Sequence, residues 1–145
     1  METCGYFAPD LDQEQLKLIN FVYFDVKHWS NYGYVCYPSC PITPILENLS
    51  RLCSCLGSDR IILSLPLITG VNATLAFIDW IADHARDHAI SQIRILPYHE
   101  YGRARYQCLG KQYPIGNVTH LTEQDLKRFS EVLEARNLIC EVHGL

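Results

Sequence analysis

Phe21-Val22-Tyr23-Phe24-Asp25-Val26-Lys27-His28 is the stretch that decides the fold of this 145-residue chain. Its first residues form a nearly continuous apolar run, which is typical of a strand covered on both faces of a sheet. Asp25 and Lys27 follow where the run ends, and residues two apart on a strand point to the same side. Because ligands collect at the carboxyl ends of strands in parallel α/β folds, the stretch predicts a buried strand with a polar site at its end.

Helical and strand periodicities alternate along the rest of the chain, with short connectors. Residues 1–6 resemble the tail of a strand and the turn after it, and further strands are predicted at residues 61–65, 93–96 and 138–142. Helices are predicted at residues 10–19, 43–56 and 73–88, and a last one is capped by Thr122 with Asp125 in a capping box. Residues 98–120 are expected to be irregular.

Alternating strands and helices imply parallel pairing with right-handed crossovers. Two architectures remain open on this pattern, namely a doubly wound open sheet and part of a barrel. No glycine-rich phosphate-binding motif occurs, which disfavours the nucleotide-binding open sheets. No repeat or linker interrupts the chain, so we expect a single domain.

Composition limits the classes of function. The chain is 48% hydrophobic and carries a formal net charge of -4, with no cluster of Lys and Arg. This balance argues against a nucleic-acid partner or a membrane-surface role. No apolar stretch approaches the roughly 20 residues of a membrane span. We therefore expect a cytoplasmic protein.

Seven cysteines at irregular spacing fit a reduced intracellular protein better than a disulfide scaffold. Cys36 and Cys40 form one close pair, and Cys53 and Cys55 form another, but C-x2-C spacing is absent. On the predicted helix, Cys53 and Cys55 point about 200° apart. Burial as small apolar side chains is the favoured interpretation, and a metal site is the alternative.

Five blocks of sequence stand in the order and approximate spacing seen in the glycyl-radical-enzyme activating proteins. The blocks are ETCGY at 2–6, YFDVKH at 23–28, ILENL at 45–49, LPLITGVN at 65–72, and ILPYHEYG at 95–102 followed by YQCLG at 106–110. The chain thus resembles the pyruvate formate-lyase activating enzyme and its relatives in the radical SAM superfamily, from residue 2 to about residue 143.

The resemblance implies a partial (βα)6 radical SAM barrel with outer helices. Proteins of this family hold a [4Fe-4S] cluster and S-adenosylmethionine, and they abstract a hydrogen atom from a glycine of a partner enzyme. Residues 1–145 resemble only the carboxyl-terminal part of that barrel, as a single incomplete domain. The C-x3-C-x2-C cluster loop and the Gly-Gly-Glu strand of the family do not occur in the sequence. Cys36 and Cys40 cannot replace the loop, because no cysteine follows at residues 41–43.

Two functional interpretations follow from this resemblance. The first is a fragment of an activating enzyme that is inactive alone because it cannot bind the cluster. The second is a non-catalytic docking module, or one half of a split activase. The implied partner is a pyruvate formate-lyase-type glycyl radical enzyme or a missing amino-terminal half. We also expect self-association, because residues 2–4 or 21–26 would leave an uncovered apolar strand edge.

The resemblance places S-adenosylmethionine against Asp25, Val26, Lys27 and His99. This cofactor presents an ammonium, a carboxylate and hydroxyl groups, so its site needs an acid and a base in fixed geometry. The alternative for Asp25 and Lys27 is a simple ion pair at a strand end, and for His99 a cap on backbone groups. Glu2 is implied to hold a monovalent cation together with Asp25.

The resemblance also implies a rim where the glycine loop of the partner enters, lined by Tyr98, Tyr101, Arg103 and Tyr106. The alternative is a solvated loop packed on the barrel. Ser64 departs from the family, since relatives commonly have an arginine there that contacts the cofactor. A serine cannot supply a charged bidentate donor, so weaker cofactor binding is expected.

Overall fold

A computed structural model describes residues 1–8, 13–30, 40–113 and 118–143. Five parallel strands form one sheet in the order β1-β2-β3-β4-β5. The strands are β1 Glu2–Thr3, β2 Val22–Asp25, β3 Ile61–Leu67, β4 Gln92–Pro97 and β5 Ile139–Val142. The helices are α1 Gln13–Lys17, α3 Ile42–Leu56, α4 Leu75–Asp87, α5 Tyr101–Cys108 and α6 Glu123–Glu134, with a 3-10 turn η1 at Ser58–Arg60.

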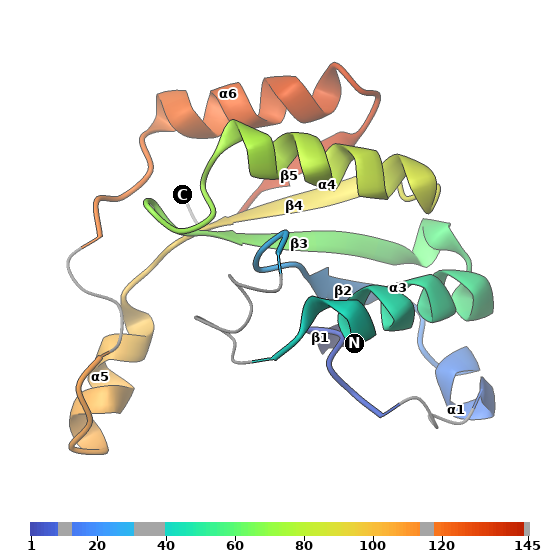
Figure 1. The fold of residues 1–145 in the computed structure, drawn as a ribbon, viewed down its shortest axis with the longest axis horizontal. Helices are drawn as coiled ribbons and strands as arrows, with labels where there is room; N and C mark the ends of the chain where they lie inside the picture. Colours follow the sequence, from blue (N-terminus) through green and yellow to red (C-terminus); the bar gives the residue numbers. More distant parts are fainter. Residues whose placement is uncertain (9–12, 31–39, 114–117, 144–145) are drawn as a thin grey trace.

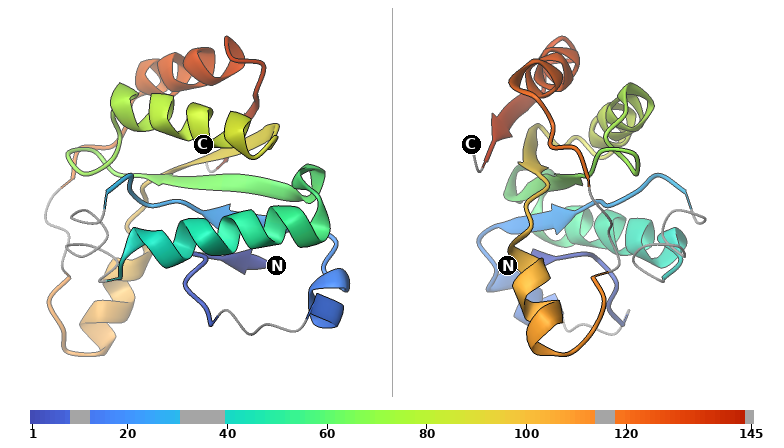
Figure 2. Two further views of the ribbon diagram at one scale, coloured as in Figure 1. Left: turned by 45° about the vertical axis from the view of Figure 1, so that its right-hand side comes forward. Right: turned by 90° about the vertical axis from the view of Figure 1, so that its left-hand side faces the viewer.

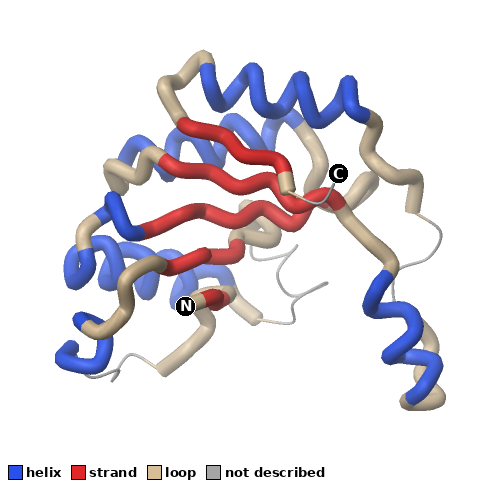
Figure 3. The backbone as a smooth tube through the Cα atoms, turned by 180° about the vertical axis from the view of Figure 1, so that it is seen from behind, coloured by secondary structure: helices blue, strands red, loops and turns tan. Residues whose placement is uncertain are grey.

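The strand order follows the chain order, so every crossover moves the sheet in the same direction. Right-handed crossovers of this kind place their helices on one face of the sheet. Figure 1 shows α3 and α4 in front of the strands, and Figure 2 shows both on the same side in its end-on view. Seen from behind, no helix of the described residues crosses the sheet (Figure 3). We call this uncovered side, which carries Tyr23, Asp25, Ile62, Ser64 and Arg94, the open face.

This arrangement confirms the predicted α/β class with parallel strands and outer helices. It also selects the barrel-like alternative, because a doubly wound sheet reverses its direction and carries helices on both faces.

The core lies between the sheet and the helices. Strand residues that point to the helices are almost fully buried, among them Phe24, Leu63, Leu65, Ile93 and Ile95. The helices contribute their apolar stripes: Ile45, Leu49 and Leu52 from α3, and Phe77, Ile78, Ile81 and Ala85 from α4. The intervening residues of β2 are only half-buried. The prediction of a strand covered on both faces is therefore wrong for β2, because the described residues cover one face only.

Several predicted boundaries shift in the structure. Helix α1 is shorter than expected, with residues 9–12 outside the described residues. Helix α3 begins at Ile42 with Pro41 as its N-cap, ahead of the predicted Thr43. Helix α5 forms within the stretch that was expected to be irregular. The Thr122–Asp125 capping box at the start of α6 is confirmed.

Pro66 does not end β3, which continues to Leu67 and pairs Pro66 with Leu96 of β4. The backbone groups of Ser64 face β2, since the Ser64 carbonyl accepts from the Val26 N–H at 2.9 Å. Pro66, two residues on, faces the same way, but β2 has ended by this level. The missing N–H of proline thus leaves no ladder hydrogen bond unmade, which is why a central strand tolerates it.

The turn after β1 depends on Gly5. Its φ of +76° lies in the left-handed region, and a Cβ there would lie 2.3 Å from Cζ of Phe24. The buried Asn48 side chain of α3 donates to the carbonyls of Gly5 and Phe7, at 2.8 and 2.9 Å. The turn is therefore held between the core ring of Phe24 and one polar anchor on α3.

We expect Gly5→Ala to destabilise the chain by about 2–4 kcal/mol, because it combines left-handed strain with a clash against a buried ring. Gly70→Ala is the matched control. Gly70 has a φ of +79°, and a methyl group added there would meet nothing within 4 Å, so the control should lose only about 1 kcal/mol. Urea unfolding measures both changes, and equal losses would contradict the packing argument.

No helix in the described ranges is both long enough and apolar enough to cross a membrane.

Candidate functional site

Asp25 and Lys27 form an ion pair at the carboxyl end of β2, which is the alternative that the sequence left open for these two residues. The Lys27 ammonium lies 2.8 Å from Oδ2 of Asp25, and the two side chains are 35% and 16% exposed. The second carboxylate oxygen, Oδ1 of Asp25, is buried and has no hydrogen-bond partner in the described part of the chain. Buried polar atoms are normally hydrogen-bonded, so this oxygen is a candidate ligand contact.

Asn72 fixes the backbone on which Lys27 stands. Its buried side chain donates from Nδ2 to the Lys27 carbonyl at 2.8 Å and to the Pro66 carbonyl at 2.6 Å. Its Oδ1 accepts from the Ile68 N–H at 2.7 Å. One side chain therefore ties the ends of β2 and β3 together after the two strands stop pairing.

The sequence analysis did not identify this role of Asn72. The available signal was an amide in an otherwise apolar segment directly after a buried strand.

We expect Asn72→Asp to lower the free energy of unfolding by about 2–4 kcal/mol, because two buried carbonyls lose their donor and face a carboxylate instead. Asn20→Asp, at an exposed position, is the control and should stay within about 0.5 kcal/mol. Thermal and urea unfolding of both variants measure the difference. An Asn72→Asp chain as stable as the control would show that the amide is not the tie between the strands.

Val26 and His99, which the resemblance also places against the cofactor, lie at the same end of the sheet but differ in burial and in their contacts. The Val26 side chain is buried in the core at 1% exposure, so only its backbone is available at the open face. His99 is exposed, and its ring lies 4.3 Å from that of Tyr101. The structure thus brings Asp25 and Lys27 into contact, whereas the contact of His99 is with the rim.

Glu2 is exposed on β1 and pairs in register with Tyr23. Asp25 lies two residues further along β2, so the two carboxylates share the open face without standing opposite each other.

Three of the four rim residues, all but Tyr101, contact Tyr113. The Tyr98 and Tyr113 hydroxyls share a hydrogen bond at 3.0 Å, the Arg103 guanidinium lies 5.0 Å from the Tyr113 ring centre, and Tyr106 meets that ring edge-on. This shared hydrogen bond, together with burial, raises the pKa of Tyr113. Tyr101 is 82% exposed, and α5 projects away from the sheet beyond the carboxyl ends of its strands (Figure 1).

Arg94 is a second residue that sequence reasoning missed. It interrupts the apolar strand β4, and its guanidinium lies 4.9 Å from the ring centre of Tyr23 on β2. The side chain therefore reaches across β3 over the open face. A charged residue at an alternate position of a buried strand was the signal that could have identified it.

His28, the residue after Lys27, is half-buried. Its ring stacks on Trp29 at 4.5 Å, and its Nδ1 accepts from the Ser30 N–H at 3.2 Å. Burial lowers the pKa of His28. The neutral ring is thus the form that the fold favours next to Lys27.

The described cysteines are all free and do not form a metal centre. They are Cys4, Cys40, Cys53, Cys55, Cys108 and Cys140. Within the described ranges, no group of three or more His, Cys, Asp or Glu side chains could hold a metal ion. Cys36 lies outside the described residues. Burial raises the pKa of the Cys40 and Cys53 thiols, which fits the interpretation of these two as packing residues.

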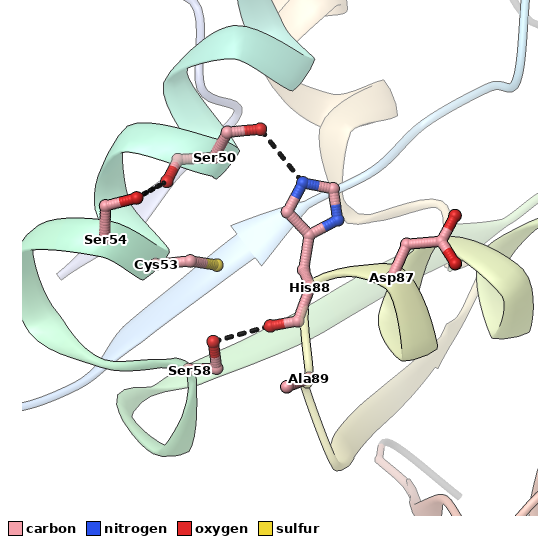
Figure 4. A pocket seen from close by; sticks show the side chains of 7 residues that line it. All are labelled: Ser50, Cys53, Ser54, Ser58, Asp87, His88 and Ala89. Atoms are coloured by element: carbon pink, nitrogen blue, oxygen red, sulfur yellow. Dashed lines mark hydrogen bonds between the residues drawn. The ribbon is translucent and has the colours of Figure 1, made fainter.

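A pocket of about 340 Å³ lies at the opposite end of the sheet, between the end of α3 and the end of α4. Figure 4 shows its lining. His88 Nε2 lies 2.9 Å from the Ser50 hydroxyl, and the Ser58 hydroxyl donates to the His88 carbonyl at 2.5 Å. These bonds join two helices at the amino ends of β3 and β4. The pocket is therefore remote from Asp25 and Lys27, and we interpret its polar groups as structural.

The amino-acid sequence of the chain is similar to those of several activating enzymes. It is 25% identical over 142 residues to the 4-hydroxyphenylacetate decarboxylase activating enzyme of Clostridioides difficile, covering 98% of this chain and 45% of the relative. It is 30% identical over 133 residues to the isethionate sulfite-lyase activating enzyme of Nitratidesulfovibrio vulgaris, covering 92% of this chain and 43% of the relative. No family model matches.

The fold has a counterpart among solved structures. A domain of a pyruvate-formate lyase-activating enzyme from Bacteroides vulgatus superimposes with a TM-score of 0.75 at 18% identity, covering 99% of this chain and 79% of that domain. The homologues of the chain are thus glycyl-radical-enzyme activating enzymes, which confirms the resemblance. The chain spans less than half the length of the curated relatives named above.

Proposed function

We propose that this chain forms the part of a glycyl-radical-enzyme activating enzyme that binds S-adenosylmethionine at the carboxyl ends of β2 and β3. The observation that carries the proposal is the Asp25–Lys27 pair with its buried, unpartnered Oδ1. Homology to activating enzymes over nearly the whole chain supports it.

The residues at this end fit the charged head of S-adenosylmethionine. The Lys27 ammonium supplies a cation for a carboxylate, and Oδ1 of Asp25 supplies an acceptor for an ammonium or a hydroxyl group. Glu2 shares the open face, so a monovalent cation near Asp25 is part of the same proposal. The buried Asn72 amide keeps the Lys27 backbone in place while the side chain changes partners.

His99 and the rim around Tyr113 belong to the proposal at the same end. His99 would approach the adenosine part of the cofactor from β4. The rim residues Tyr98, Tyr101, Arg103 and Tyr106 would receive the glycine loop of a pyruvate formate-lyase-type partner. Tyr101 is 82% exposed, so its ring is accessible to a partner protein.

When bound together, S-adenosylmethionine and a [4Fe-4S] cluster supply the one-electron chemistry that makes a glycyl radical. The C-x3-C-x2-C loop does not occur in this sequence, and we attribute no step of that chemistry to its cysteines. Our proposal is that the chain alone does not activate a partner enzyme and that it works in a reducing compartment such as the cytoplasm. The six free cysteines of the described residues support the reducing compartment.

A second candidate function is one half of a split activase, or a docking module without catalysis. The edge of the sheet favours it, because β1 pairs with β2 alone among the described residues. An unpaired parallel edge offers backbone groups to another strand. A missing amino-terminal half would complete this edge, and a second copy of the chain would account for self-association.

The proposed cofactor site can be tested by titrating the chain with S-adenosylmethionine in a calorimeter. We expect saturable binding, and we expect Asp25→Asn and Lys27→Gln each to weaken it about tenfold or more, because each removes a charge-assisted contact.

Lys17→Gln is the matched control. Lys17 is also paired with a carboxylate, Glu14 at 2.6 Å, but on the surface of α1. Its variant should bind as the native chain does. Absence of saturable binding, or equal binding by all variants, would contradict the proposal.

A further inference from the structure

A row of three polar side chains crosses the open face. The register pairs Asp25 of β2 with Ser64 of β3, and Ser64 with Arg94 of β4. Residues paired in register in a sheet point to the same face, so all three side chains share the open face. Asp25 and Arg94 are two strands apart, or about 10 Å between their backbones.

Each member of this row has a buried polar atom without a hydrogen-bond partner in the described part of the chain. The atoms are Oδ1 of Asp25, Oγ of Ser64 and Nε of Arg94. Ser64 is the most constrained of the three, at 1% exposure in the central strand. Buried polar atoms without partners are rare and costly, so three in adjacent positions point to a ligand that satisfies them together.

The Arg94 side chain reaches from β4 over the open face to Tyr23 of β2. Its neighbour on β5 is Glu141, yet the described residues show no ion pair between them. The guanidinium lies instead over the ring of Tyr23, 4.9 Å from the ring centre. A contact of this kind holds the cation in place while leaving its N–H groups free to donate.

The donor and acceptor pattern defines the chemistry of the ligand. Nε of Arg94 is a donor only, and the Ser64 hydroxyl next to it can also donate. Together they suit an anionic oxygen. Oδ1 of Asp25, on the other side of Ser64, accepts only, and it suits a cationic N–H.

We propose that Arg94 and Ser64 form an anion-binding pair that takes the carboxylate of a ligand with an amino-acid head group alongside Lys27, while Oδ1 of Asp25 takes its ammonium. Arg94 would then be a specificity-determining residue, because it selects ligands that carry a carboxylate. That the ligand is S-adenosylmethionine rests on the proposed function. The anion-binding role of Arg94 and Ser64 rests instead on the unpartnered buried atoms of Asp25, Ser64 and Arg94.

Calorimetry with two probes tests the pair. S-Adenosylmethionine carries the carboxylate, and decarboxylated S-adenosylmethionine lacks only that group. We expect Arg94→Gln to weaken binding of the first probe about tenfold or more and to leave the second unchanged, because the lost contact is charge-assisted. Ser64→Ala should show the same selectivity with a smaller, severalfold loss.

Arg86→Gln is the control, because Arg86 is a paired arginine on the surface of α4, within 3.2 Å of Asp83. It should bind both probes as the native chain does. Equal weakening of both probes by Arg94→Gln, or no weakening of either, would overturn the pair. Circular dichroism of each variant excludes a loss of folding as the cause.

A second measurement separates this inference from the proposed function. The Nε–H signal of Arg94 in an NMR spectrum can be assigned by its absence from Arg94→Gln. We expect it to shift saturably with L-methionine and not with L-methioninol, which lacks the carboxylate. A shift with L-methionine in a chain that does not bind S-adenosylmethionine would reject the proposed function and keep the pair. A signal that no carboxylate shifts would reject the pair.

Discussion

The parallel register of β2, β3 and β4 is the constraint on which the rest of the structure depends. It places Phe24, Leu63 and Ile93 in one row against the helices. One residue further along, it places Asp25, Ser64 and Arg94 in one row on the open face. Because side chains alternate along a strand, a slip of one residue would exchange the apolar core row for the polar row. The hydrophobic effect that buries the first row therefore also assembles the second.

The candidate site lies where the pairing between β2 and β3 ends. Strand β2 stops pairing after Asp25, whereas β3 continues to Leu67 along β4. The Pro66 carbonyl then lacks a strand partner on the side of β2, and the buried Asn72 amide takes its place. The same amide holds the Lys27 carbonyl. Lys27 is thus presented beyond the sheet on a backbone that is fixed, while its side chain stays at the edge of solvent.

Ser64 stands where the resemblance leads us to expect an arginine. From the sequence alone, this difference suggested that the site had lost a positive charge. The structure places the Arg94 side chain in register beside Ser64, and its guanidinium reaches across to Tyr23. A guanidinium is therefore present on the open face, but it comes from the next strand. No pattern within one strand could show this, because the neighbour of Ser64 is 30 residues away in the chain.

The sequence by itself determined the alternation of strands and helices, the helix-facing core, the Thr122 capping box and the placement of Asp25 and Lys27 on the same side of a strand end. These features follow from local periodicity, from capping chemistry and from the two-residue repeat of a strand, which all act within a few residues. Only the tertiary structure decided that the sheet winds in one direction, that no helix of the described residues covers one face, and that Asn72 joins two strand ends. It also decided that Pro66 remains within β3 and that Arg94 lies beside Ser64. These features depend on which strand lies next to which, and that choice is made by packing between distant segments.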